Sequence, residues 1–113
     1  MFTVYKKFEF ASAHQLEGHE KCGKLHGHNY TIEAWVSSIN LIKPHNFVID
    51  FHEFSNIAKE YDHNGKILKI SSEMLAKEIA KKIANKSINP KEVKVKVWES
   101  DHTYAEYLLV VDF

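Results

Sequence analysis

The stretch that decides the fold reads His26-Gly-His-Asn-Tyr-Thr-Ile-Glu-Ala-Trp-Val-Ser-Ser38. Its apolar and polar residues alternate, and a period of two is the signature of a half-buried strand. A second alternating stretch, from Phe2 to His14, precedes it. The sequence therefore predicts two long strands joined by a polar loop that carries Gly18 and Gly23.

Two helices are predicted in the middle of the chain. Asp50 and Glu53 have the spacing of a capping box, and an apolar stripe follows as far as Tyr61. Ser71 or Ser72 can cap a second helix that reaches about Asn85. A brief extended piece over residues 47–49 leads into the first helix.

Two further strands are expected near Val93–Glu99 and Tyr104–Phe113, as a hairpin. The order strand, strand, helix, helix, strand, strand lacks the alternation of parallel α/β folds. We therefore expect an α+β fold with an antiparallel sheet. The 113 residues suit a single domain spanning residues 1–113.

Composition narrows the classes of function. Fifteen basic residues, all lysine, balance fifteen acidic ones, which argues against nucleic acid or an anionic membrane as the main partner. The single cysteine excludes an internal disulfide and fits a reducing cytoplasm. The N-terminal residues lack a signal-peptide pattern, and no apolar run approaches membrane-spanning length.

Three histidines form the candidate metal site. His26 and His28 are two residues apart on a predicted strand and so share a face, and His14 ends the neighbouring strand. Three imidazoles with one open position are the ligand set of a catalytic zinc site. Without a metal, the three rings would simply line a polar sheet face.

Cys22 lies four residues before His26, close to the predicted metal. A thiolate there can act as a base or nucleophile. An inert buried thiol and a fourth zinc ligand are the other interpretations of this residue.

These residues resemble a known family, that of 6-pyruvoyltetrahydropterin synthase and 6-carboxytetrahydropterin synthase. The resemblance begins with Phe10-Ala-Ser-Ala-His14 and with Cys22-Gly-Lys-Leu-His26-Gly-His28-Asn-Tyr30. Four shorter pieces in the same order extend it along nearly the whole chain: Val48–Phe51, Tyr61-Asp62-His63, Ser71–Ala76 and Val97–Ser100.

The resemblance implies the tunnelling fold, in which a four-stranded antiparallel sheet carries two helices on one side. In the family, three subunits close a barrel and two barrels stack into a homohexamer. Active sites lie between subunits. The expected substrate is a small pterin triphosphate, and the expected cofactor is Zn²⁺.

The spacing of the cysteine from the histidine pair implies which activity the chain has. Three residues, Gly23 to Leu25, separate Cys22 from His26. The 6-carboxy enzymes usually have three residues there, whereas the 6-pyruvoyl enzymes usually have five. A third subgroup has glutamate in place of the cysteine. We therefore expect a zinc-dependent lyase that supplies the 7-deazaguanine pathway to queuosine or archaeosine, with the 6-pyruvoyl activity or a non-catalytic pterin- or metal-binding protein as alternatives.

The family also implies roles for the remaining site residues. Cys22 would be the base. His63 would exchange protons with the substrate or the cysteine, and Asp62 would orient the His63 ring. Glu99 would anchor the pterin. An ordinary helix-end pair and a rim glutamate are the alternatives. Lys21 and Lys24 could contact the triphosphate. Histidines elsewhere are expected at the surface or in turns, namely His19, His45, His52 and His102.

The chain departs from the family pattern in three places. The segment between His63 and Ser71 is shortened, which would reshape the pocket wall. Gln15 stands where many relatives have arginine, and Ile70 stands where a proline-threonine pair usually begins the helix.

Overall fold

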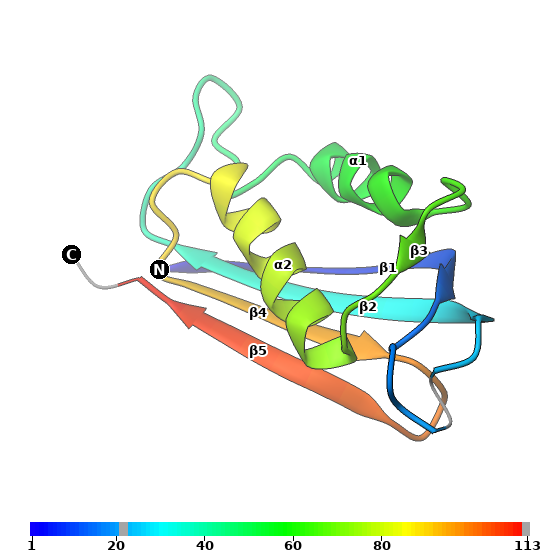
Figure 1. Cartoon of the computed structure of the whole chain (residues 1–113). Coiled ribbons are helices and arrows are strands. Elements are labelled where there is room, and N and C mark those ends of the chain that lie inside the picture. Colours follow the sequence, from blue (N-terminus) through cyan, green and yellow to red (C-terminus); the bar gives the residue numbers. More distant parts are fainter. Residues whose placement is uncertain (21–22, 112–113) are drawn as a thin grey trace.

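Figure 1 shows the computed structural model of the chain, which describes residues 1–20 and 23–111. The elements follow in the order β1 (Phe2–His14), β2 (His26–Ser38), α1 (His52–Tyr61), β3 (Ile67–Leu68), α2 (Ser72–Asn85), β4 (Glu92–Trp98) and β5 (Tyr104–Val110). Apart from the two-residue strand β3 between the helices, strands and helices are segregated along the chain, so the predicted α+β class is confirmed.

The five strands form one sheet in the order β3-β1-β2-β4-β5. β1 and β2 pair antiparallel over their whole length, from Phe2 opposite Ser38 to His14 opposite His26. The short strand β3 runs parallel to β1, so the sheet is mixed rather than purely antiparallel as predicted. A two-residue strand is too short to leave a periodic pattern in the sequence.

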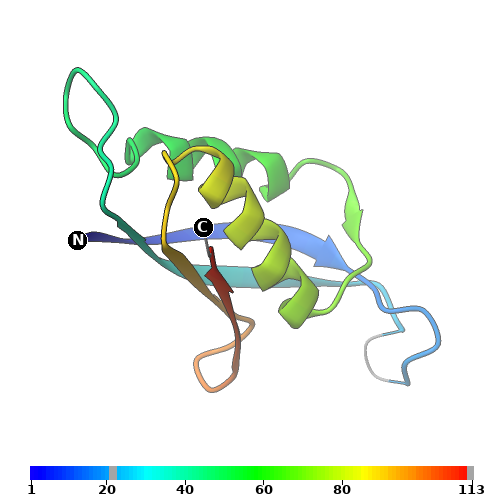
Figure 2. The same cartoon turned by 90° about the vertical axis from the view of Figure 1, so that its left-hand side faces the viewer.

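Both helices cover the same side of the sheet, as the two views in Figures 1 and 2 show. The buried face of β2 continues across the sheet into β4 and is covered by the apolar stripes of α1 and α2. The fully buried side chains of this core include Ile32, Ala34, Val36, Phe54, Ile79, Ile83, Val93, Val95 and Val97. On the same side of the sheet, the C-terminal end of β1 and the N-terminal end of β2 are polar and carry the three histidines.

The helix ends differ in how they are capped. The hydroxyl of Ser71 accepts the N–H of Met74 at 3.2 Å, which satisfies one free donor at the start of α2. The Asp50 carboxylate accepts the N–H of His52 at 2.9 Å. The predicted reciprocal bond from Glu53 does not form, because its carboxylate lies 3.5 Å from the Lys86 ammonium instead.

Smaller differences concern the other elements. β4 ends at Trp98, one residue before Glu99, and β5 ends at Val110. The predicted extended piece over residues 47–49 is reduced to one isolated bridge between Ile42 and Phe47. Among the described residues, neither helix combines the length and the apolar character needed to cross a membrane.

Candidate metal centre and active site

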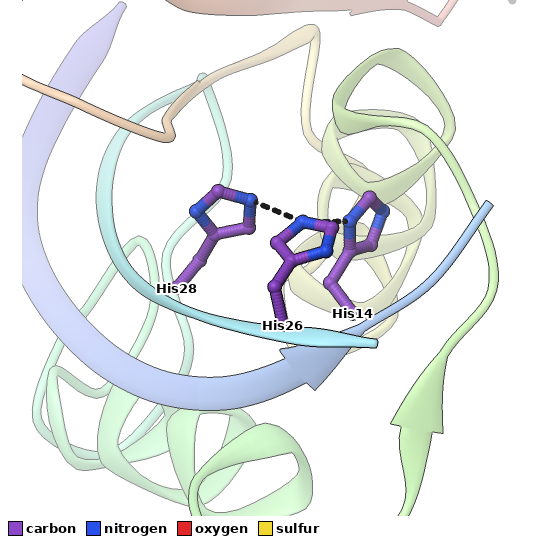
Figure 3. A group of neighbouring side chains, drawn as sticks. All are labelled: His14, His26 and His28. Carbon is purple, nitrogen blue, oxygen red and sulfur yellow. Dashed lines mark hydrogen bonds between the residues drawn. The ribbon is translucent and has the colours of Figure 1, made fainter. Parts of the chain in front are cut away.

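Three imidazoles converge at the end of the two long strands (Figure 3). His14 lies directly opposite His26 in the β1–β2 register, and His28 follows on the same face of β2. His26 Nε2 lies 3.2 Å from His14 Nδ1 and 2.9 Å from His28 Nε2. One ligand atom from each ring therefore lies within 4.8 Å of the other two.

Main-chain carbonyls orient two of the three rings. His14 Nε2 lies 2.9 Å from the carbonyl oxygen of Ile70, and His26 Nδ1 lies 2.6 Å from that of Lys24. A carbonyl only accepts, so these ring nitrogens carry the protons. The opposite nitrogens, His14 Nδ1 and His26 Nε2, face each other.

This arrangement fits a metal ion. His14 Nδ1 and His26 Nε2 face each other at 3.2 Å, a separation at which one cation can bind both nitrogens. Zinc–nitrogen bonds of about 2.0–2.1 Å place tetrahedral donors roughly 3.3 Å apart, close to the spacing of these rings. A carbonyl on the outer nitrogen is the usual companion of a metal-binding histidine. The residues present therefore fit zinc, with one coordination position left open.

His28 has the electrostatics of a neutral ligand. Its partial burial lowers the pKa of the ring, and the charges of His26 and His14 act in the same direction. The carboxylate of Glu99 opposes this shift, which shows that Glu99 lies close enough to be felt at the cluster. A lowered pKa keeps the imidazole neutral, and only the neutral ring can bind a metal.

Glu99 is the carboxylate on this side of the sheet. It follows the buried face of β4 and is half-buried. Its Oε1 accepts a hydrogen bond from the hydroxyl of Ser72, the first residue of α2. Both residues line a small hollow of about 130 Å³. Ser71 caps the helix, so the neighbouring hydroxyl of Ser72 is available to hold the carboxylate.

The side chains of Asp62 and His63 form a close pair where the end of α1 meets β1. His63 Nδ1 lies 3.0 Å from Asp62 Oδ1. The same carboxylate oxygen accepts the N–H of Ala11 at 2.8 Å, and the N–H of His63 donates to the Ala11 carbonyl at 2.9 Å. The Ala11 N–H, and then His63, hold the pKa of the Asp62 carboxyl below its usual range.

The backbone at His63 is unusual. Its φ of 45° lies in the left-handed region, which is uncommon for a residue with a side chain. The paired bonds to Ala11 hold it there. Nδ1 of His63 faces Asp62, so Nε2 is the ring nitrogen that could exchange a proton with another group.

The pair is not brought to the histidine cluster within this chain. His63 is 76% exposed and lines a groove of about 490 Å³ with Ala11, Ala13, Gly27 and Asn29. These strand residues alternate with the three histidines along β1 and β2, so they face the other side of the sheet. His28 is the only member of the cluster that also contributes to the lining of this groove.

The remaining predicted residues either lie outside the described residues or contribute no side chain to the histidine cluster. Cys22 and Lys21 lie outside the described residues, and the Lys24 side chain is exposed. Asp50 was predicted to cap the first helix; the N-cap of α1 is Phe51, and the Asp50 carboxylate accepts the N–H of His52 from just before it. The other histidines are all exposed, namely His19, His45, His52 and His102.

Sequence reasoning missed three polar contacts of the site. They are the carbonyls of Ile70 and Lys24 and the hydroxyl of Ser72. A carbonyl is common to every residue type and leaves no signal in a sequence. Ser72 did leave one, because a doublet of serines at a helix start supplies one hydroxyl more than the cap needs.

The fold and the three converging histidines define a sheet-and-helix protein with a candidate mononuclear metal centre. The chain belongs to the 6-pyruvoyl tetrahydropterin synthase family, whose sequence model matches residues 3–109. A protein of Archaeoglobus fulgidus, provisionally named 6-carboxy-5,6,7,8-tetrahydropterin synthase, is 35% identical over 104 residues, covering 86% of this chain and 87% of its own. The 6-carboxy-5,6,7,8-tetrahydropterin synthase of Haemophilus influenzae is 29% identical, covering 95% and 99%.

Solved structures share the fold. The 6-pyruvoyl tetrahydropterin synthase of Caenorhabditis elegans matches with a TM-score of 0.69 at 19% identity and covers 94% of each chain. That of Plasmodium falciparum matches with a TM-score of 0.67 at 16% identity, covering 96% of this chain and 99% of its own. The predicted tunnelling fold is therefore confirmed for the subunit.

Proposed function

We propose that this protein is a 6-carboxytetrahydropterin synthase, a zinc-dependent lyase that converts dihydroneopterin triphosphate and water to 6-carboxytetrahydropterin, acetaldehyde and triphosphate. The observation that carries the proposal is the convergence of His14, His26 and His28, with one nitrogen of each ring directed toward the other two rings. The names of the related proteins and the three residues between Cys22 and His26 favour the 6-carboxy product.

Bound zinc would lower the pKa of the substrate's side-chain hydroxyls and polarise its carbonyl group. Glu99, held by Ser72, accepts the adjacent N–H donors of the pterin and so orients the ring. Cys22 removes a substrate proton as the base. His63 exchanges protons through Nε2 because Asp62 fixes Nδ1 as the protonated nitrogen.

The active site is shared between copies of the chain in this proposal. Asp62 and His63 face a groove on the side of the sheet opposite to the histidine cluster, so they serve the cluster of a neighbouring copy. β5 forms one edge of the sheet, and the two-residue strand β3 pairs with only a small part of β1 at the other. Among the described residues these edges are free to continue the sheet into a barrel, in a homohexamer. A cytoplasmic location stays a prediction from the single cysteine.

Product analysis by mass spectrometry tests the proposal. Zinc-loaded protein is given dihydroneopterin triphosphate beside a Cys22→Ala variant. We expect 6-carboxytetrahydropterin and acetaldehyde from the wild type and neither from the variant. Bound pterin without any turnover would contradict the enzyme and would favour a binding protein.

The second candidate function is 6-pyruvoyltetrahydropterin synthase, which eliminates triphosphate from the same substrate but keeps the carbon chain. The same family description favours it, and it uses the same site residues. A pyruvoyl product in the experiment above would select it. The proposed roles of the histidines and Glu99 would stand in that case.

A further inference from the structure

Gln15 lies at the junction of two segments that orient the metal-binding rings. It directly follows His14, at the end of β1. Its main-chain N–H donates to the carbonyl of Leu68 at 2.9 Å, and its side-chain Nε2 donates to the carbonyl of Gly23 at 2.9 Å. One residue therefore fastens two separate segments to the strand that carries a metal ligand.

Each of these segments supplies a carbonyl to one histidine. Leu68 lies two residues before Ile70, whose carbonyl meets His14 Nε2. Gly23 lies one residue before Lys24, whose carbonyl meets His26 Nδ1. Moving either segment would release a ring nitrogen from the partner that fixes its tautomer.

The Gly23 segment is closely fitted as well as tethered. The N–H of Gly23 donates to the His19 carbonyl at 2.7 Å. A Cβ at position 23 would collide with that same carbonyl. Gly23 can therefore approach the His19 carbonyl this closely because it has no side chain.

We propose that Gln15 is a positioning residue, whose side-chain amide holds the Gly23–Lys24 peptide so that His26 presents Nε2 to the metal. The inference rests on the metal-binding role in the proposed function and extends it to a residue outside the ligand set. It is specific for one ring, because the main-chain N–H of Gln15, not its side chain, serves the segment that orients His14.

Zinc affinity measured by competition with a chelator tests the proposal without reference to turnover. Gln15→Leu removes the donor and is expected to weaken zinc binding about 10- to 100-fold, the usual effect of losing the partner of a metal-binding histidine. Gln15→Glu cannot donate either and should weaken binding similarly. Gln15→Arg keeps a donor and should stay close to the wild type. Asn85→Leu, which removes an exposed amide at the far end of α2, is the matched control.

A second measurement separates this inference from the proposed function. Nitrogen-15 NMR of the metal-free protein at mildly alkaline pH reports the tautomer of each ring. We expect His26 to carry its proton on Nδ1 in the wild type and to mix tautomers in Gln15→Leu, while His14 stays protonated on Nε2 in both.

Wild-type zinc affinity and an unchanged His26 tautomer in Gln15→Leu would overturn the inference, and so would an equal loss of affinity in Asn85→Leu. A wild type that binds zinc but forms no product would overturn the proposed function alone. A wild type that does not bind zinc would overturn the metal centre, and the tautomer of His26 would still decide the role of Gln15.

Discussion

The histidine cluster and the Asp62–His63 pair are built in opposite ways. The cluster lies under the helix-covered side of the sheet, with His14 only 2% exposed and two rings fixed by carbonyls. The pair lies in a groove on the other side, with His63 76% exposed. The ligand set is thus assembled within one chain, whereas the proton-transfer pair is presented outward. In the proposed function, the subunit alone would therefore bind the metal, whereas proton transfer would need a neighbouring copy.

Loss of a ligand should have the largest effect. His26→Ala removes the central ring and is expected to lower zinc affinity more than about 100-fold, beyond the range for losing a mere orienting partner. Turnover should fall to the background rate. Chelator competition and product formation measure the two effects. His45→Ala, which changes an exposed histidine beside Phe47, should leave both at wild-type values.

Loss of the outward pair should separate chemistry from metal binding. His63→Ala is expected to lower kcat about 10²- to 10⁴-fold, the contribution of a positioned acid or base. Zinc affinity should not change, because the side chains of Asp62 and His63 bond to each other and to the main chain of Ala11, away from the three ligands. A variant that loses its zinc together with its activity would contradict the separation of the two regions.

Mixing two inactive variants tests whether the regions meet between copies. Chains carrying His26→Ala and His63→Ala are unfolded, combined in equal amounts and refolded together. In random mixtures about one quarter of the shared sites would combine an intact cluster with an intact pair, so a corresponding share of activity should return. Activity that stays absent, with both variants assembled as the wild type, would mean that the site is not shared.

The carboxylate beside the cluster should affect substrate binding more than the chemical step. Glu99→Gln removes the charge that accepts the pterin donors, and KM is expected to rise roughly 10- to 100-fold, as for a hydrogen bond to a charged group. Ser72→Ala should raise KM by less, since it removes only the partner of that carboxylate. Steady-state kinetics with Glu92→Gln as an exposed control on β4 check both. A fall in kcat alone would contradict the anchoring role.

The smallest effect concerns stability and pH. The folded pKa of Asp62 is held below its unfolded value, so the ionised carboxylate stabilises the folded protein above the unfolded pKa of about 3.9. That stabilisation is lost as the pH falls through the lower, folded pKa. Asp62→Asn should therefore unfold more easily than the wild type at neutral pH, and the gap should close in acid. Denaturant titrations across the acidic range measure this. A difference in stability between Asp62→Asn and the wild type that grew in acid would contradict a stabilising role of the ionised carboxylate.

Much of the fold could be predicted because its patterns are long. The alternation along residues 2–14 and 26–38 runs for thirteen residues in each strand, and the structure returns the same bounds. β3 could not be predicted, since its two residues pair with β1 through a contact distant in sequence. The start of α1 was predicted with a capping box, but tertiary packing turns Glu53 toward Lys86.

The candidate site follows the same division. His14, His26 and His28 could be brought together from strand alternation alone, since the antiparallel register places the first opposite the second. The side of the sheet that Asp62 and His63 face depends on the path of the chain after α1. No local sequence pattern predicts this path. From the sequence, Gln15 was interpreted only as the loss of a contact that arginine makes in many relatives. The structure shows that its side-chain amide donates to the carbonyl of Gly23.

The direct opposition of His14 and His26 links metal binding to folding. These two residues are the pair of the β1–β2 hairpin nearest the connecting loop, so the strands must pair at that end before both rings can hold one ion. An unfolded chain offers the same imidazoles far apart and binds more weakly. Zinc at 100 times its dissociation constant would then add about 2.7 kcal/mol to the free energy of unfolding. The metal would hold β1 and β2 together at the loop end of the hairpin, and its removal would lower the free energy of unfolding by the same amount.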